Sequence, residues 1–344
     1  MKALVFHEPE RISVDQVPEP SPGAGEVVVR VAAAAICYSD IRVYKGLKHA
    51  ESGVIPGHEI AGVVAEVGEG VDSVAVGDHV VVCPIVACGR CHFCLSGRRH
   101  RCLTRITLGY DVNGGLAEYL LATAQIVSLG HLLRVPDGLD LQRAALTEPI
   151  ACVLNSIEAC DLSAGSSVAI IGAGPMGLLH LLLARQLGAG TVFMSEPDEE
   201  RRAIASKMGA DLVIDPRQTS FVDTVKELTS GLGADAVIVS AGIADVVGES
   251  LAAARAQGVV NLFAGFPPDS SVSFDPNIVH NKEIRLTGSQ NASIEQYQQV
   301  LDLLPQMPQV DEITTHRFSL DDATKSYEVR LRNEGLKSMV VMGD

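Results

Sequence analysis

Apolar residues in the second half of the chain recur in short runs, and amphipathic stretches lie between them. From residue 168 onward this pattern predicts six strands, with helices between the first five. Such an alternation of strands and helices is typical of a doubly wound parallel sheet. The predicted strands cover residues 168–172, 191–195, 212–214, 236–239, 259–263 and 284–288.

The first part of the chain has a different pattern, in which strand-like segments are separated by Pro and Gly. Residues 1–35 are predicted to form short strands, and the β-branched run at 27–31 follows a Pro- and Gly-bearing segment at 18–25. A turn at Gly77 leads into another strand. Further on, two helices are predicted at 293–304 and 319–332, with Ser293 and Ser319 as N-caps, and a strand at 337–341.

Length and composition limit the classes of protein to which this chain can belong. At 344 residues it is expected to form two domains of about 100–200 residues each. A content of 47% hydrophobic and 20% charged residues describes a globular protein, and the net charge of −15 argues against nucleic acid or an anionic membrane as a partner. Residues 162–184 carry no charge, but Gly, Ser and Pro interrupt them, so we expect no membrane span. The first residues lack a signal-peptide core, which predicts a cytoplasmic location.

The first strand of the alternating region leads directly into a glycine-rich turn. Residues 172–177 read G-A-G-P-M-G, and a helix is predicted at 178–187. In such a turn, the first glycine allows the sharp bend, the second lets the backbone approach a pyrophosphate, and the third lets helix and strand pack closely. The sequence therefore predicts a dinucleotide site. Its residues in the turn are Gly172, Gly174, Pro175, Met176 and Gly177.

An acidic residue follows the second predicted strand of this region. Glu196 lies 19 residues beyond Gly177, where a carboxylate suits the hydroxyl groups of the adenosine ribose. The same carboxylate would repel the 2′-phosphate of NADP. NAD is therefore the predicted coenzyme.

Four of the eight cysteines lie in one short loop with the spacing C-x2-C-x2-C-x7-C. Four thiolates on such a loop fit a closed tetrahedral zinc site. An iron–sulfur cluster is the main alternative, but no proline follows the fourth cysteine and the sequence contains no second cysteine set. The loop is also rich in arginine, which leaves a zinc-stabilised nucleic-acid-binding or regulatory module as an alternative function. The predicted ligands are Cys88, Cys91, Cys94 and Cys102.

Cys37 and His58 form a second candidate metal site, with carboxylates close to them in the sequence. One cysteine, one histidine and a carboxylate are ligands of the kind found in zinc sites that keep a position open for a substrate. Each residue alone also fits a buried structural position. From these residues taken alone, both interpretations stay open.

The motifs together resemble the zinc-containing medium-chain alcohol and polyol dehydrogenases. They are G-H-E-x2-G-x5-G-x2-V from Gly57, the four-cysteine loop, T-E-P from Thr147, and the glycine turn from Gly172, in that family's order across nearly the whole chain. The resemblance implies an α/β plus β fold. A GroES-like β-barrel catalytic domain is expected at 1–150, completed by 285–344, with an inserted Rossmann doubly wound parallel sheet at 151–284. It also implies a homo-oligomer, with a tetramer favoured.

The resemblance assigns ligands to the second metal site. Cys37 and His58 take the positions of catalytic zinc ligands. Glu148 stands where the alcohol dehydrogenases proper have a second cysteine, which is the pattern of the polyol dehydrogenases. Glu59 also approaches or ligates the metal in that branch, so the direct third ligand is left open between Glu59 and Glu148.

Other site residues also follow from the resemblance. Ser39 matches the Ser or Thr that hydrogen-bonds the substrate oxygen, whereas Arg42 stands where many members have a proton-relay histidine. Arg201 resembles a basic residue beside the adenosine, and Lys337 matches a position that reaches the pyrophosphate. Strand ends of the predicted parallel sheet add cofactor-binding candidates. These are Ser240, Phe263, Gly265 and Thr287.

The resemblance implies an NAD-dependent enzyme with one catalytic and one structural Zn²⁺. The expected substrate is a small molecule: a secondary alcohol, a polyol or a sugar-derived hydroxy compound. Hydride would pass between this molecule and NAD. A quinone-reductase-like enzyme without zinc is a further alternative, but such enzymes lack both ligand sets. Positive charge near the expected substrate entrance suggests an anionic group on the substrate. The residues concerned are Arg42, Lys45, Lys48 and His49.

Overall fold

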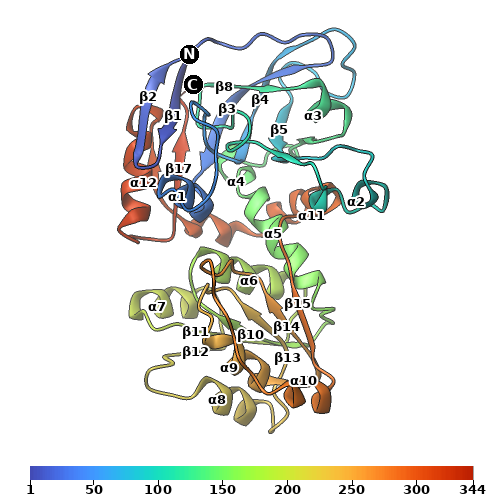
Figure 1. Ribbon diagram of the computed structural model, residues 1–344, viewed down its shortest axis with the longest axis vertical. Coiled ribbons are helices and arrows are strands. Elements are labelled where there is room, and N and C mark those ends of the chain that lie inside the picture. Colours follow the sequence, from blue (N-terminus) through green and yellow to red (C-terminus); the bar gives the residue numbers. More distant parts are fainter. Residues whose placement is uncertain (344) are drawn as a thin grey trace. The chain divides into compact units, whose positions relative to one another are not determined.

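The computed structural model describes residues 1–343, which divide into two compact units (Figure 1). The first unit comprises Met1–Ala151 and the chain from Asn291 onward, and the second comprises Cys152–Gln290. The sequence placed the later boundary before residue 285. The boundary lies further on because β15 (Arg285–Gly288) pairs with β14 (Ala254–Leu262) in the sheet of the second unit.

A seven-stranded sheet forms the centre of the first unit, in the order β16-β17-β3-β4-β5-β9, with β8 paired to β3. Its pairs are antiparallel except β16–β17, which is parallel. Strands from the two ends of the described chain therefore meet in one sheet. The bounds are β3 Val27–Ala35, β4 Glu59–Val67, β5 His79–Val82, β8 Tyr119–Ala122, β9 Leu132–Arg134, β16 Thr314–Phe318 and β17 Lys337–Val341.

Smaller elements surround this sheet. The hairpin of β1 and β2 is tied to the segment before β8 through main-chain bonds such as that from Leu4 N to Leu116 O, 2.8 Å long. The remaining strands are β1 Lys2–Glu8, β2 Arg11–Gln16, β6 Ile85–Val86 and β7 Ile106–Thr107. The helices are α1 Tyr38–Tyr44, α2 His92–Leu95, α3 Ala124–Ser128, α4 Leu141–Ala144, α11 Ile294–Leu303 and α12 Ala323–Leu331, and α5 Thr147–Glu158 crosses the boundary between the units.

The second unit is built on a six-stranded parallel sheet in the order β12-β11-β10-β13-β14-β15. This order reverses between β10 and β13, as in the dinucleotide-binding doubly wound folds, and it confirms the predicted parallel sheet. Ligands of such sheets bind at the carboxyl ends of the strands near this reversal. The other strands are β10 Ser167–Ile171, β11 Thr191–Ser195, β12 Leu212–Ile214 and β13 Ala234–Val239.

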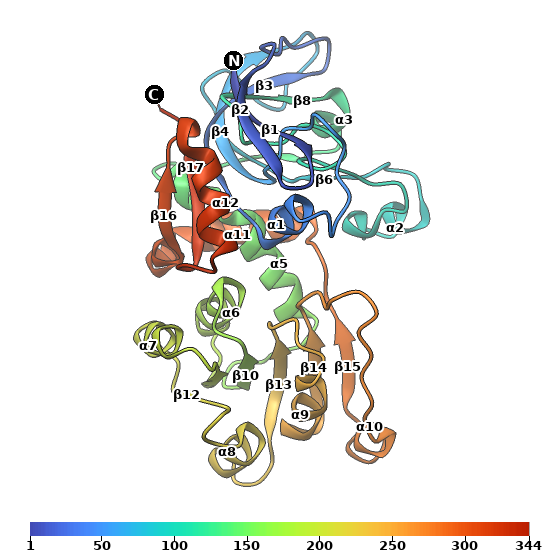
Figure 2. The ribbon, with the colours of Figure 1, turned by 60° about the vertical axis from the view of Figure 1, so that its left-hand side comes forward.

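A helix follows each of the first five strands of this sheet (Figure 2). The sequence did not predict α10, between β14 and β15. Its start is well specified, because the Asp275 side chain accepts the N–H of Asn277 and Pro276 begins the helix. Its two core-facing residues, Ile278 and Val279, are adjacent in the sequence and only partly buried, so they give little helical periodicity. The five helices are α6 Pro175–Gln186, α7 Glu199–Lys207, α8 Phe221–Leu228, α9 Val246–Ala253 and α10 Pro276–Lys282.

The two predicted helix caps near the end of the chain had different outcomes. Ser293 caps α11 as predicted, in a capping box whose second half is the Gln296 side chain. Ser319 instead precedes a short 3-10 turn at Leu320–Asp322, and α12 begins only at Ala323. Across residues 1–343, no helix combines the length and apolar character needed to cross a bilayer.

Candidate active site

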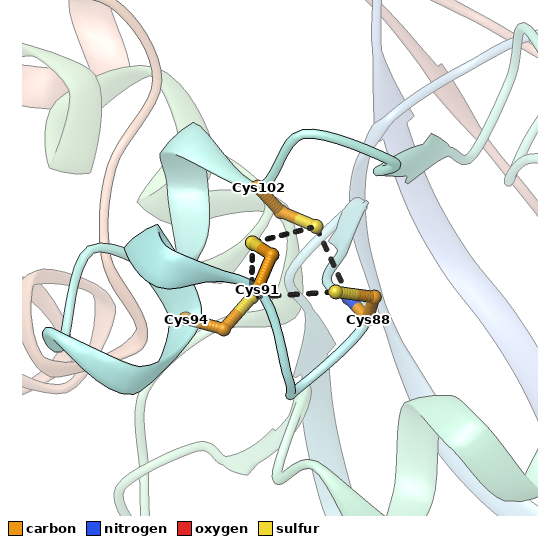
Figure 3. Close-up of side chains that lie close together, drawn as sticks. All are labelled: Cys88, Cys91, Cys94 and Cys102. Carbon is orange, nitrogen blue, oxygen red and sulfur yellow. Dashed lines mark hydrogen bonds between the residues drawn. The ribbon is translucent and has the colours of Figure 1, made fainter.

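The four cysteines of the loop converge in the first unit (Figure 3). Their sulfur atoms all lie within 4.8 Å of one another, with Cys91 Sγ 3.5 Å from Cys94 Sγ and 3.9 Å from Cys102 Sγ. The Cys88 N–H also donates to Cys102 Sγ over 3.2 Å. All four are free thiols, so the loop has the arrangement of a metal site rather than of a disulfide pair.

Main-chain groups favour the ionised form of two of these thiols. Backbone N–H groups at Arg90 and Cys91 lower the pKa of Cys88 to about 6, and those at Leu103 and Cys94 lower the pKa of Cys91. Burial raises the pKa of Cys94 to about 12. A cation is needed to hold all four sulfurs as thiolates, and this donor set fits Zn²⁺.

The second candidate metal site forms where β3 ends and β4 begins. The two strands pair antiparallel with Ala35 opposite Glu59, which brings Cys37, just beyond β3, close to His58 and Glu59. One ligand atom from each of these three residues lies within 4.8 Å of the others. His58 and Glu59 are buried, and Cys37 is half-buried at the N-terminus of α1.

The carboxylate of Glu59 is fully buried and carries an orphan oxygen. Its Oε1 accepts a hydrogen bond from Lys337 Nζ over 2.7 Å, while its Oε2 has no hydrogen-bond partner among residues 1–343. Burial would lower the pKa of Lys337, but the Glu59 carboxylate raises it, so the lysine keeps its charge at neutral pH. A buried carboxylate oxygen without a partner beside a thiol and an imidazole fits a zinc ligand.

The sequence did not predict the contact between Lys337 and Glu59. The Lys337 ammonium is buried on Glu59 and also donates to Ile36 O over 3.4 Å. Here it is the counter-charge of a candidate ligand. A contact between Lys337 and a coenzyme pyrophosphate stays a prediction.

His58 is oriented by two residues that sequence reasoning did not identify. Its Nδ1 lies 3.2 Å from Asp40 Oδ1 and 3.1 Å from Tyr110 Oη, so Nε2 is the ring nitrogen left to face a metal. Burial would lower the pKa of His58, but the Asp40 carboxylate raises it well above its usual value. Tyr110 Oη also lies 2.6 Å from Ser39 Oγ, which links the predicted Ser39 to the same network.

A local signal existed for one of these two residues. Asp40 closes a capping box of α1, because its Oδ2 accepts the Cys37 N–H over 2.8 Å, and a residue three positions past an N-cap is recognisable in a sequence. No such signal exists for Tyr110, which is 52 positions from His58 and reaches it only through folding.

The glycine turn of the second unit has the geometry that its motif requires. Gly172 has φ +102°, a value that side-chain-bearing residues avoid. A Cβ on Gly177 would lie 1.9 Å from Gly172 O, so only glycine allows α6 to pack against β10 at this point. Gly174 is the N-cap of α6 and Pro175 its first residue, so the helix N-terminus follows directly on the turn.

Glu196 lies next to this turn. Its Oε2 accepts the N–H of Ala173 over 2.8 Å, and its Oε1 accepts the N–H of Asp198 over 3.0 Å. The carboxylate thus connects the end of β11 with the glycine turn, where the sequence predicted the adenosine ribose.

Two arginines near Glu196 share one carboxylate. Arg202 and Arg217 both pair with Asp215, and Arg202 also donates to Glu196 O over 3.1 Å. The Arg217 partner lowers the pKa of Asp215 to about 2. Arg201, which the sequence placed beside the adenosine, donates its backbone N–H to Asp198 at the start of α7.

The predicted strand-end residues lie along the carboxyl edge of the parallel sheet. Ser240 N donates to Ile171 O over 2.9 Å, so Ser240 lies beside the glycine turn. The Phe263 ring packs edge-on against His180 of α6, with ring centroids 4.6 Å apart. Gly265 follows Phe263 in the same loop, and Thr287 pairs with Asn261 in the last strand pair.

Comparison with known proteins identifies the family. Residues 23–133 match the family described as alcohol dehydrogenase GroES-like domain, and residues 175–306 match the family described as zinc-binding dehydrogenase. An L-threonine 3-dehydrogenase from Pyrococcus furiosus is 33% identical over 337 residues, covering 96% of this chain and 95% of that protein. The chain belongs to the zinc-binding alcohol dehydrogenases.

Other relatives of this dehydrogenase act on polyols or have been solved with a coenzyme. A sorbitol dehydrogenase from Halalkalibacterium halodurans is 33% identical, covering 99% of both chains. A zinc-binding dehydrogenase from Sinorhizobium meliloti, solved with NADP, has a TM-score of 0.92 at 31% identity, covering 99% of this chain and 98% of that one. An alcohol dehydrogenase from Escherichia coli CFT073, solved with NADH, has a TM-score of 0.90 at 27% identity, covering 99% of both.

These likenesses confirm the predicted α/β plus β fold class, a GroES-like part with a Rossmann part. They give no support to the nucleic-acid alternative, since the matching proteins are oxidoreductases. The basic cysteine loop therefore needs no nucleic-acid partner to explain it in this dehydrogenase.

The geometry helps to choose between Glu59 and Glu148 as the third metal ligand of the dehydrogenase. The set of converging ligand atoms contains Glu59 and not Glu148, which lies half-buried in the first turn of α5. This favours Glu59. Arg42 lies half-buried in the last turn of α1, and the structure shows no ion pair for it in residues 1–343.

The buried ion pair gives a stability prediction for the dehydrogenase. Lys337→Met should lower the free energy of unfolding by about 3 kcal/mol, because it takes a hydrogen-bonding ammonium away from the buried Glu59 carboxylate. Urea denaturation measures this loss. The matched control is Lys325→Met, which breaks the exposed Lys325–Asp322 pair and should lower the free energy of unfolding far less. Equal losses for the two variants would contradict the role of Lys337.

Proposed function

We propose that this dehydrogenase transfers hydride between NAD and a secondary alcohol, a polyol or a sugar-derived hydroxy compound. The observation that carries the proposal is the convergence of Cys37, His58 and Glu59, with a free Glu59 oxygen, in a chain that also has the Rossmann turn. Three ligands of these types leave a fourth position for a substrate.

In this proposal, Cys37, His58 and Glu59 hold one Zn²⁺. Bound there, zinc supplies Lewis acidity that lowers the pKa of a substrate hydroxyl. Asp40 fixes the orientation of His58 through Nδ1. Ser39 Oγ, held by Tyr110, is the proposed hydrogen-bond partner of the substrate hydroxyl and its first proton acceptor.

Arg42 cannot replace a relay histidine as a proton carrier, since a guanidinium stays protonated and has no acceptor atom. We therefore propose that Arg42 acts only through its charge. The proton would then leave Ser39 through water.

The four-cysteine loop is the proposed site of a structural Zn²⁺. Its donor set is complete, so it leaves no position for a substrate. The proposal thus requires two zinc ions per chain.

The test combines metal analysis with a substrate screen that follows NADH absorbance. Two zinc ions per chain and oxidation of at least one secondary alcohol or polyol are expected. Zinc in the cysteine loop alone, without turnover of any alcohol, would refute the proposal. The homotetramer and the cytoplasmic location stay predictions.

Coenzyme preference gives a further prediction. NAD should have a higher kcat/KM than NADP, because the Glu196 carboxylate would face the 2′-phosphate and Asp215 occupies the nearby arginines. Glu196→Gln should lower the ratio of kcat/KM with NAD to kcat/KM with NADP by at least about tenfold, since it removes the repulsion between two negative charges. Steady-state kinetics with both coenzymes measure the ratio.

The control for this prediction is Glu199→Gln, which removes an exposed charge in the first turn of α7. This variant should keep the NAD-to-NADP ratio of kcat/KM within about twofold of the wild-type ratio, since exposed charges are screened. A wild-type preference for NADP would disprove the role of Glu196.

A further inference from the structure

A short loop after α1 holds Lys48 beside the candidate metal site. Leu47 N donates to Arg42 O over 2.8 Å before Lys48, and Glu51 N donates to Tyr110 O over 2.8 Å after it. The loop is therefore tied to the end of α1 on one side and to the Tyr110 main chain on the other. This anchoring limits where the Lys48 side chain can reach.

The Lys48 ammonium lies over the face of the Tyr110 ring, 3.5 Å from its centroid. The hydroxyl of the same ring lies 3.1 Å from His58 Nδ1 and 2.6 Å from Ser39 Oγ. A single aromatic ring thus separates a lysine charge from a metal-ligand candidate and from the proposed partner of the substrate hydroxyl. A small molecule bound through its hydroxyl group would have its neighbouring atoms within reach of Lys48.

Lys48 forms no ion pair within the described chain, although the Asp40 carboxylate acts on its charge from further away. Across residues 1–343 the structure shows no carboxylate within 4.0 Å of Lys48, whereas Lys2, Lys325 and Lys337 each have one. The nearby Asp40 carboxylate is buried and engaged with His58. The ring holds the ammonium on one side by a cation–π contact and leaves N–H groups on the other side for another ligand.

We propose that Lys48 binds an anionic group, a carboxylate or a phosphate, on the substrate. The substrate would then be a hydroxy acid or a phosphorylated polyol rather than a neutral alcohol. An ammonium near a metal centre attracts such a group and hydrogen-bonds it with charge assistance. The inference rests on the proposed function, because it names the substrate class of that same site.

The test compares matched neutral and anionic substrates. D-arabitol and its 5-phosphate form the phosphate arm, and butan-2-ol and 3-hydroxybutanoate form the carboxylate arm. The wild type should have a higher kcat/KM for the anionic member of at least one pair. The pair that shows this preference identifies the anionic group as phosphate or carboxylate. Lys48→Met keeps the length of the side chain and removes the charge, so it should lower the anionic-to-neutral ratio of kcat/KM about tenfold to a hundredfold.

Lys45→Met is the matched control. Lys45 is exposed in the same loop, and the structure shows no aromatic contact for it. It should change the anionic-to-neutral ratio of kcat/KM by less than about twofold, since no ring holds its charge beside the site and solvent screens it. Equal changes in the two variants, or a Lys48→Met variant with an unchanged ratio, would overturn the proposal.

A binding measurement separates this inference from the proposed function. If no alcohol is turned over, the proposed function fails, but calorimetric titration with D-arabitol 5-phosphate still tests Lys48. Binding to the wild type that weakens about tenfold or more in Lys48→Met supports the anion site. The same titration is made with 3-hydroxybutanoate for the carboxylate. If the wild type binds neither compound, or if the two proteins bind equally, the proposal is disproved.

Discussion

Replacing Cys37 by serine should abolish alcohol oxidation and leave the chain folded. Cys37 supplies one of the three converging ligand atoms and is half-buried at the N-cap of α1. Serine is a good N-cap residue, so α1 should be retained. Its hydroxyl is a much poorer ligand for zinc than a thiolate, so the metal should be lost. Because that metal contributes several kcal/mol to catalysis, kcat should fall at least about a thousandfold.

Turnover, zinc content and thermal unfolding together test this prediction. The variant should keep its melting temperature and lose one of two zinc ions. The control is Cys160→Ser, which removes a buried thiol outside both ligand sets and should keep both zinc ions. A Cys37→Ser variant that fails to fold, or that still oxidises alcohols at the wild-type rate, would show that Cys37 is not a catalytic ligand.

Replacing Cys91 by serine should destabilise the protein, whereas replacing Cys37 should leave it folded. The loop has little apolar core of its own: Ala87, Cys94 and Cys102 are the buried members of its cluster. Zinc binding therefore replaces packing as the source of order, and structural zinc contributes about 10–16 kcal/mol in small zinc-binding peptides. Losing a ligand should lower the melting temperature by more than about 5 °C, even if only a fraction of that energy is lost.

Calorimetry and limited trypsin digestion measure this effect. Once the loop opens, cleavage should appear at Arg90, Arg98 or Arg101, which are exposed. Leu95→Ser is the control, because Leu95 is 77% exposed in the same loop and contributes no thiol. It should leave both readouts unchanged. An unaltered melting temperature in Cys91→Ser would rule out a structural zinc there.

The parallel sheet was predictable because its inner strands β10, β11 and β13 are almost wholly buried and appear as continuous apolar runs. β11 and β12 have the predicted bounds. β14 begins before the predicted residue 259, because its first residues include Arg255 and Gln257 and pair with β13 through an irregular register. Polar residues at a strand start leave no apolar signal for sequence analysis.

The candidate metal ligands were predictable because each belongs to a local motif, such as the cysteine spacing or the run from Gly57. Tyr110 and the Lys337–Glu59 pair were not. Lys337 and Glu59 are 278 positions apart, and only the pairing of β17 with β3 brings them together. The preference for Glu59 over Glu148 as the proposed third ligand likewise rests on the folded backbone.

The placement of β17 also orders events during synthesis. Strand β3 is made early, but its Ala33–Ala35 edge stays unpaired until β17 emerges, after the whole of the Cys152–Gln290 unit. That unit can pair all its strands beforehand, since domains fold as units while the chain is being made. The growing chain must therefore tolerate an open sheet edge and a Glu59 carboxylate without its ammonium. A ribosome that stalls before Lys337 would release a chain with both defects, and such a chain should be prone to aggregation.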